Sequence, residues 1–271
     1  PPSTSCDAEL APTAACAADA QGVDDDDKPL VTLVAPGSAG DVFPLLAVGH
    51  HLQRLGLRVR VACHDAYRSQ VLGAGFQYRV LAGDPLKGRG GAATTGDAAD
   101  ELWRLQLRDY QAAVQGSHLI AFNWFGVAGL HLAEAMGVAC VALWLVPFTR
   151  TNQLPACFFY EPRMKAAGEA LQQRHGAQWC AATHLLWEKM FWQPFATIFN
   201  EWRVKTLGIE PLDEHGHFVS MLRRRIPVLY GWGEAILKAP SDWPKNHVVC
   251  GYFDPPEGAA TEGLHCPSSL D

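Results

Sequence analysis

The fold is decided by residues 30–41, Leu-Val-Thr-Leu-Val-Ala-Pro-Gly-Ser-Ala-Gly-Asp. The first six are mostly apolar or β-branched, which is typical of a buried strand, and Pro36-Gly37 ends it. After the turn, apolar residues recur at i, i+3, i+7 and i+10, which predicts one face of a helix that Gly56 ends. These apolar residues are Leu45, Val48, Leu52 and Leu55. A strand, a polar turn and a helix in this order predict the first unit of a parallel sheet.

The same alternation continues along the chain. Further strands are expected over residues 57–63, 78–82, 118–122, 139–146, 226–230 and 248–252, and helices over 66–74, 103–114 and 127–136. An aromatic helix over 187–202 is expected to break near Pro194. Strands joined by right-handed helical crossovers predict an α/β fold with a doubly wound, Rossmann-like parallel sheet. Residues 87–95 are rich in glycine and predict a loop; no strand leads into it, which disfavours a phosphate-binding loop there.

Charge divides the 271 residues into a leader, a body and a tail. Residues 1–28 hold seven acidic residues and one lysine, so they carry the whole net charge of −6. They predict a disordered acidic leader or a tag, because residues 24–28 spell the enteropeptidase recognition sequence. We expect them to be dispensable, and the start at Pro1 suggests a processed, tagged or partial chain. Residues 29–254 form the expected domain, and residues 255–271 the expected linker or tail.

Composition excludes several classes of protein. The neutral body offers no electrostatic footprint for nucleic acid. The longest uncharged apolar stretch, residues 137–148, has 12 residues, fewer than the roughly 20 that cross a bilayer. The eight cysteines lack Cys-x-x-Cys spacing, so no zinc or other metal site and no disulfide framework are expected. Cys63 and Cys140 lie in apolar runs and predict small buried hydrophobes in a reducing, cytoplasmic compartment.

Polar residues follow three of the expected strands, where ligands bind in open parallel sheets. They lie at residues 37–41, 64–65 and 148–151. Neither Gly37 with Gly40 nor Gly73 with Gly75 has the Gly-x-Gly-x-x-Gly spacing of a dinucleotide site, so a nucleotide-dependent dehydrogenase is disfavoured.

Asp41 has two interpretations. It stands where a short glycine-rich loop enters a helix, and a carboxylate there stabilises the helix by about 1 kcal/mol as a cap. The same carboxylate can take a proton from an acceptor hydroxyl, although the helix dipole stabilises its charge and weakens it as a base. Spacing alone favours the cap and leaves both open.

Residues 36–44 resemble the loop after the first strand in sterol 3-beta-glucosyltransferases and related glycosyltransferases, whose common form is Gly-Ser-Arg-Gly-Asp-Val-x-Pro. The resemblance runs in unbroken order over about residues 29–254. It is carried by residues 55–59, 63–64, 74–76, 83–85, 147–151, 229–231 and 251–252, and by the following spaced motifs. These are Gly129-x-His131-x-Ala133-Glu134-Ala135-x-Gly137, Asn200-x-Trp202-Arg203-x-x-x-Leu207-Gly208 and Pro240-x-Asp242-Trp243-Pro244.

The resemblance implies the N-terminal, acceptor-binding half of a GT-B UDP-glycosyltransferase, which has two Rossmann-like domains facing a cleft. It implies Asp41 as the catalytic base, and Ala39 departs from the usual arginine, which puts a charge contact there in doubt. His64 matches a common family histidine, with a loop-capping histidine as the other interpretation, and Arg150 is expected to line the cleft. The expected substrate-binding residues are Gly37, Ser38, Gly40, His64, Phe148 and Arg150.

Aromatic residues are dense over residues 155–202. A helical aromatic stripe is more often core than ligand site. Trp192 and Phe199, however, fall off the face of Trp187 and Trp202, and surplus apolar surface marks a membrane, a partner or a flat apolar ligand.

The leading hypothesis is an inverting transfer of a hexosyl group, glucose above all, from a UDP-sugar to a sterol or other lipid hydroxyl. No cofactor is expected; the UDP-sugar is a co-substrate held mainly by a C-terminal domain, and nothing after Gly251 resembles its nucleotide-binding loop. The expected partners are the lipid acceptor, the nucleotide sugar and, at the periphery, a membrane surface, with no nucleic acid. The alternative is a non-catalytic lipid-binding or regulatory half-domain without a donor site.

Overall fold

The computed structural model describes residues 27–83 and 97–257, which form one parallel β-sheet with helices on both faces. The strand order is β3-β2-β1-β4-β5-β6-β7, and every neighbouring pair is parallel. The strands are β1 (Leu30–Val34), β2 (Arg58–Cys63), β3 (Gln77–Val80), β4 (Leu119–Phe122), β5 (Ala139–Trp144), β6 (Val228–Tyr230) and β7 (His247–Val249). Strands β2 and β3 are added on one side of β1, and β4 to β7 on the other side. The order of the strands therefore reverses between β1 and β4, and the crevice beyond the carboxyl ends of these two strands is the expected ligand position.

Helices connect the strands and confirm the expected doubly wound α/β class. The α-helices are α1 (Ala39–Arg54), α2 (Arg68–Gly73), α3 (Asp97–Ala113), α4 (Ala128–Met136), α5 (Lys165–His175), α6 (Trp179–Trp192), α7 (Ala196–Trp202) and α8 (Gly216–Arg223). Short turns of other helix types are η2 (Asp65–Tyr67), η4 (Trp124–Gly126), η5 (Cys157–Tyr160), η6 (Pro162–Met164), η7 (Gly176–Gln178) and the π-turn η8 (Arg203–Leu207). The glycine-rich residues 87–95, most of the leader and the end of the tail lie outside the described residues.

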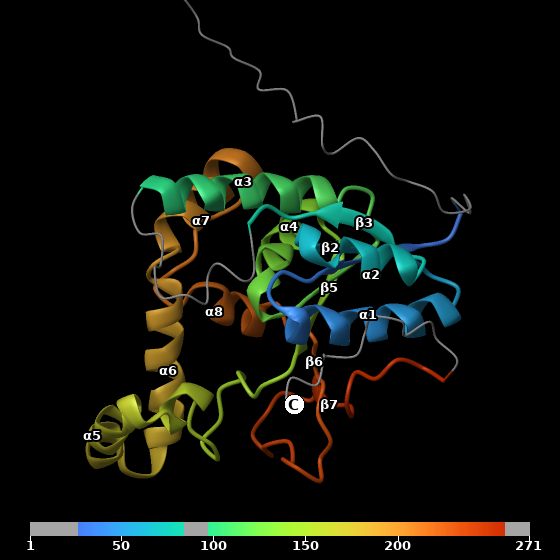
Figure 1. Cartoon of the computed structure of the whole chain (residues 1–271). Coiled ribbons are helices and arrows are strands. Elements are labelled where there is room, and N and C mark those ends of the chain that lie inside the picture. Colours follow the sequence, from blue (N-terminus) through green and yellow to red (C-terminus); the bar gives the residue numbers. More distant parts are fainter. Residues whose placement is uncertain (1–26, 84–96, 258–271) are drawn as a thin grey trace, which may run out of the picture.

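The pleat of the strands sends alternate side chains to two cores. Leu33 and Ala121 pack with α1 and α2, whereas Val34 and Phe122 pack with α3, α4, α7 and α8. In Figure 1, α1 lies below the sheet and α3 above it. This arrangement buries the strands on both faces, which is why their sequences are nearly continuous apolar runs.

The expected small buried hydrophobes are confirmed at two cysteines. Cys63 and Cys140 are buried, and burial raises the pKa of the Cys63 thiol to about 12 and that of Cys140 to about 11. Both thiols therefore stay protonated near neutral pH. The other cysteines of the described ranges are free as well: Cys157, Cys180 and Cys250.

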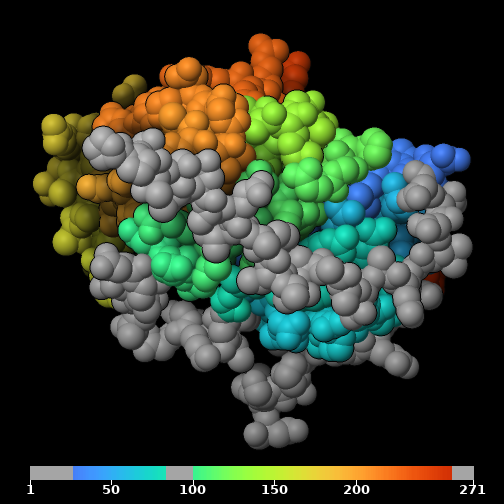
Figure 2. Space-filling view, turned by 90° about the horizontal axis from the view of Figure 1, so that it is seen from above, coloured from blue at the N-terminus to red at the C-terminus, as the bar shows by residue number. Residues whose placement is uncertain are grey.

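The long connection between β5 and β6, residues 145–227, holds α5 to α8. Figure 1 shows α5 and α6 projecting away from the sheet, while α7 lies beside α3; in the view from above, α7 (orange) adjoins the green helices α3 and α4 (Figure 2). The expected break near Pro194 is confirmed, because α6 ends at Trp192 and α7 begins at Ala196. The helices α5 and α8 were not predicted, because α5 is mostly polar and exposed and α8 is short.

The interpretation of Trp192 and Phe199 as surplus apolar surface is wrong. Their exposed fractions are 3% and 2%. Helix α8 covers α6 on one side, and Trp103 of α3 packs its ring edge-on to Phe199, with 5.9 Å between ring centroids. Because neighbours cover more than one side of α6 and α7, these helices carry apolar residues on more than one face. The expected peripheral membrane contact loses this support and stays a prediction.

Candidate functional site

The loops that follow β1 and β4 are bound to each other at the crevice. The side-chain amide of Asn123 donates to the Pro36 carbonyl over 2.7 Å, and its Oδ1 accepts from the Gly126 amide over 2.8 Å. A Cβ atom at Gly126 would lie 2.6 Å from the Val34 carbonyl oxygen, so only glycine lets the loops approach this closely. Sequence reasoning missed Asn123, although a polar residue directly after a strand was the available signal.

Asp41 caps α1. Its Oδ2 accepts from the Ser38 amide over 2.7 Å and from the Ser38 hydroxyl over 2.9 Å. Gly37 has a φ of +118°, and a Cβ there would lie 2.5 Å from the same oxygen. Oδ1 forms no hydrogen bond with the described residues, which leaves it available to a ligand. The cap is therefore present in the structure, and it leaves the second oxygen of Asp41 for the role of base.

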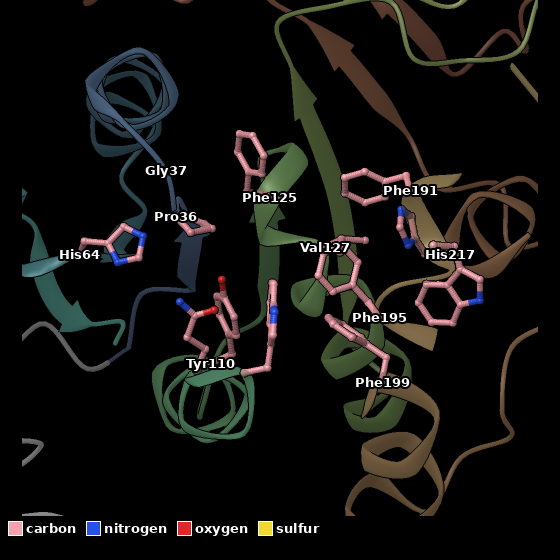
Figure 3. A pocket seen from close by; sticks show the side chains of 13 residues that line it. Pro36, Gly37, His64, Tyr110, Phe125, Val127, Phe191, Phe195, Phe199 and His217 are labelled. Atoms are coloured by element: carbon pink, nitrogen blue, oxygen red, sulfur yellow. The ribbon is translucent and has the colours of Figure 1, made fainter. Parts of the chain in front are cut away.

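An aromatic cavity of about 340 Å³ opens beside the Gly37 loop (Figure 3). Side chains from α3, α6, α7, α8 and the loops after β1, β2 and β4 surround it. We call it the aromatic cavity; its lining residues are Pro36, Gly37, His64, Trp103, Gln106, Tyr110, Phe125, Val127, Phe191, Trp192, Phe195, Phe199 and His217. The two residues that the sequence placed on a free surface, Trp192 and Phe199, thus line this cavity.

The polar groups at one end of the aromatic cavity are held by the chain that follows β3. The Nδ1 atom of His64 lies 3.2 Å from the Leu81 carbonyl oxygen, and because a carbonyl can only accept, Nδ1 carries the proton. Gln106 Nε2 donates to the Ala82 carbonyl over 2.8 Å. His64 is buried and fastens this loop, and it also lines the cavity.

A second cavity of about 350 Å³ lies next to the first, and we call it the Asp41 cavity. It is lined by Asp41, Asn123, Trp124, Phe125, Leu143, Leu145, Val146, Phe148, Phe158, Trp187 and Phe191. Phe125 and Phe191 line both cavities, and Phe125 is half exposed. Of the expected site residues, the structure therefore brings Asp41 and Phe148 to one cavity and Gly37 and His64 to its neighbour. Ser38 and Gly40 lie in the connecting loop and the first turn of α1.

Arg150 lines neither cavity. Its guanidinium pairs with the carboxylate of Glu188 on α6, where Nε donates to Oε1 over 2.7 Å and Nη2 contacts Oε2. Glu188 is 1% exposed; burial raises its pKa, and Arg150 opposes that shift. The residues on either side of Arg150 are also fastened, since Thr149 bonds to Tyr230 over 2.6 Å and Thr151 to Asp242 over 2.6 Å. This stretch therefore anchors the start of the long connection.

Two further motifs of the family resemblance meet in the core, 72 residues apart in sequence. Nη1 of the buried Arg203 donates to His131 Nδ1 over 2.8 Å and to Glu134 Oε2 over 3.1 Å. Burial and the Arg203 charge hold the pKa of His131 well below its usual range, so its neutral Nδ1 accepts the hydrogen bond. These motifs join α4 to η8 and do not line either cavity.

Comparison with known proteins shows what the chain is similar to. Residues 31–153 match the glycosyltransferase family 28 N-terminal domain, and this part of the chain resembles that domain. These residues contain β1 to β5, the Asp41 cap and the loops after β1 and β4, so they hold the crevice side of both cavities.

Curated relatives extend the match beyond this domain. A sterol 3-beta-glucosyltransferase of Yarrowia lipolytica is 29% identical over 243 residues, which cover 86% of this chain and 16% of the relative. The UDP-sugar-dependent glycosyltransferase 52 of Dictyostelium discoideum is 31% identical over 243 residues, covering 83% of this chain and 14% of the relative. The chain thus spans about one-sixth of the length of these relatives.

A solved structure supports the fold. The calicheamicin glycosyltransferase CalG4 superposes with a TM-score of 0.51 and 14% identity, over 84% of this chain and 52% of that protein. Residues 31–153 and the connection after them thus have the fold of one half of a GT-B glycosyltransferase. Within residues 27–83 and 97–257, no helix has the length and apolar character that a membrane crossing requires, and no cluster of three metal-binding side chains occurs.

Proposed function

We propose that this chain supplies the acceptor-binding half of a UDP-sugar-dependent glycosyltransferase that moves a hexosyl group to a hydroxyl of a sterol or another lipid. The observation that carries the proposal is the aromatic cavity, which adjoins the loop of Asp41 at the carboxyl ends of β1 and β4. A mostly aromatic lining suits a flat apolar ring system, and a carboxylate beside it suits proton transfer.

Asp41 is the proposed general base. Its Oδ1 takes the proton of the acceptor hydroxyl, the acceptor oxygen bonds to the anomeric carbon, and the bond from that carbon to the UDP oxygen breaks with its electron pair. Attack from the face opposite to UDP inverts the anomeric centre. The two hydrogen bonds from Ser38 to Oδ2 hold the carboxylate in place for this transfer.

We propose that a second domain, which the relatives' greater length can accommodate, binds the UDP-sugar. Groups that neutralise a departing diphosphate supply the largest catalytic term in such reactions, and a general base supplies about 10²- to 10⁴-fold. We therefore expect the 271-residue chain alone to bind an acceptor and to transfer no sugar.

The test is a chimera that joins residues 27–257 to the remaining C-terminal part of the Yarrowia lipolytica relative. Radiolabelled UDP-glucose and ergosterol are supplied, and label in the lipid phase is measured. Asp41→Asn should lower transfer about 10²- to 10⁴-fold and leave sterol binding unchanged. Asparagine can still accept the Ser38 hydrogen bonds, so the unfolding free energy should change by less than about 1 kcal/mol.

The matched control is Asp65→Asn, which changes an exposed carboxylate that bonds to Tyr78 and lines neither cavity. It should leave transfer unchanged. If Asp41→Asn lowers transfer less than tenfold, Asp41 is a cap alone. If the chimera binds sterol and transfers nothing, the lipid-binding half-domain, which needs only the aromatic cavity, becomes the better proposal.

A further inference from the structure

His217 is a buried polar side chain that forms no hydrogen bond within residues 27–83 and 97–257. It is 2% exposed and lies at the second residue of α8. Its Nδ1 is enclosed with no partner, and Nε2 makes no hydrogen bond with the described residues either. The rings of Phe218, Phe191 and Trp192 surround it, at centroid distances of 4.3, 5.8 and 5.8 Å. Phe218 and Phe191 carry no hydrogen-bonding group in their side chains, and the indole N–H of Trp192 forms no hydrogen bond with the imidazole.

The position of His217 connects it to the proposed ligand. It lines the aromatic cavity at the end opposite to His64, Pro36 and Gly37 (Figure 3). The Gly37 end adjoins Asp41, so a hydroxyl that reacts must lie there. A ligand that fills the cavity consequently presents its far end to His217.

An unpartnered imidazole in this place has a cost that a ligand can remove. A buried polar group without a hydrogen bond destabilises a protein, and an apolar residue of the same shape would avoid the cost. Burial lowers the pKa of His217 to about 3, so the ring is neutral and offers one N–H donor and one acceptor nitrogen. Because Nδ1 is enclosed, Nε2 is the atom that a hydroxyl or a keto oxygen of a ligand can reach.

We propose that the aromatic cavity selects acceptors that carry a second polar group, a hydroxyl or keto oxygen, at the end remote from the glycosylated hydroxyl, and that His217 hydrogen-bonds this group. The inference rests on the proposed function and narrows its acceptor class: a sterol with a wholly apolar tail leaves His217 unpaired. A steroid skeleton that is polar at both ends pairs it.

The experiment measures binding to the 271-residue chain by equilibrium dialysis with three tritiated ligands that share a 3β-hydroxyl. They are cholesterol, 25-hydroxycholesterol and dehydroepiandrosterone, which has a keto oxygen at the opposite end of its ring system. At least one of the two doubly polar ligands should bind about tenfold more tightly than cholesterol, the ratio expected for one buried hydrogen bond. His217→Phe should remove this preference and leave cholesterol binding equal or tighter.

Two further variants serve as controls. His217→Gln keeps a polar group and should retain part of the preference, whereas His50→Phe replaces a buried histidine of α1 outside the cavity and should retain all of it. Circular dichroism establishes that each variant is folded. The inference is overturned if cholesterol binds as tightly as both other ligands, or if the preference survives in His217→Phe. If none of the three ligands binds, the proposed acceptor role of the chain fails as well.

Discussion

The first strand and helix, residues 30–54, and the long connection between β5 and β6, residues 145–227, use polar side chains in opposite ways. In the first region, Asp41 bonds to Ser38, three residues away. In the second, Arg150 bonds to Glu188 across 38 residues, and Arg203 reaches His131 across 72. A local bond shapes one loop, whereas a long-range bond from a buried charged side chain joins separate elements.

Because of this difference, we expect one region to contribute to catalysis and the other to the stability of the fold. The Asp41 carboxylate lies in the first turn of α1 and bonds only to Ser38 within the described residues, so its replacement should change proton transfer and leave the fold intact. In the long connection Glu188 and Arg203 are buried, and a buried charge that loses its partner is strongly destabilising. Substitutions in the two regions should therefore affect different measurements.

The largest expected effect on stability comes from Arg203→Met. It leaves His131 without its hydrogen-bond donor and Glu134 with Arg224 as its remaining partner, and it removes a buried side chain, so the free energy of unfolding should fall by about 3 kcal/mol. Urea unfolding measures this. Lys205→Met, two residues away, removes only an exposed pair with Glu201 and should cost less than about 1 kcal/mol. Equal losses in the two variants would show that the buried cluster has no special role.

The second-largest effect is expected from a lower pH, which should reduce the free energy of unfolding through His217 of α8. The pKa of His217 is about 3 in the folded chain because of burial, against 6.5 for an ordinary histidine. The unfolded state takes up the proton as the pH falls below 6.5 and the folded state does not, so stability falls with pH down to about 3. Between pH 7 and pH 5 this histidine alone should account for about 2 kcal/mol.

The measurement compares urea unfolding at pH 7 and pH 5 for the unsubstituted chain and for His217→Phe. The variant should lose about 2 kcal/mol less than the parent on acidification. Identical losses would mean that His217 is protonated in the fold.

A smaller effect is expected in the first region from Gly37→Ala. The new Cβ would lie 2.5 Å from Asp41 Oδ2 at a φ of +118°, so the loop must shift, at a cost of about 1 to 3 kcal/mol. Gly56→Ala is the matched control, because Gly56 also has a positive φ and has nothing within 4 Å of its added Cβ. The melting temperature should fall further for Gly37→Ala, and a greater loss for Gly56→Ala would contradict the close approach.

The smallest effect is expected from Ser38→Ala. It removes the hydroxyl bond to Asp41 and keeps the amide bond, so the unfolding free energy should fall by about 0.5 to 1 kcal/mol. Ser69→Ala, which removes an exposed serine hydroxyl bonded to Gln70, should have no measurable effect on the melting temperature. A loss above about 2 kcal/mol at Ser38 would mean that this loop also supports the core.

The regular strands and helices could be predicted because the apolar residues of each follow the period of a strand or of a helix. The β-branched run of β1 and the apolar face of α1 were read from neighbouring residues, although Leu55 of that face lies after the helix and is exposed. The capping role of Asp41 was read from its place where a glycine-rich loop enters the helix. Arg150 was expected in the cleft because its motif matches a family position, yet its partner Glu188 is 38 residues away. No pattern among neighbouring residues predicts an ion-pair partner that far along the chain.

The amino-acid sequence by itself determined the parallel sheet and the polar turn before Asp41, because these depend on local periodicity and short spacing. Only the tertiary structure decided that Trp192 and Phe199 line a cavity, that the buried Arg203 pairs with Glu134, and that His217 lies at the end of the cavity opposite to Gly37. The physical reason is distance along the chain. Packing and pairing between separate elements depend on where the connection between β5 and β6 folds back, and that follows from the sum of many contacts.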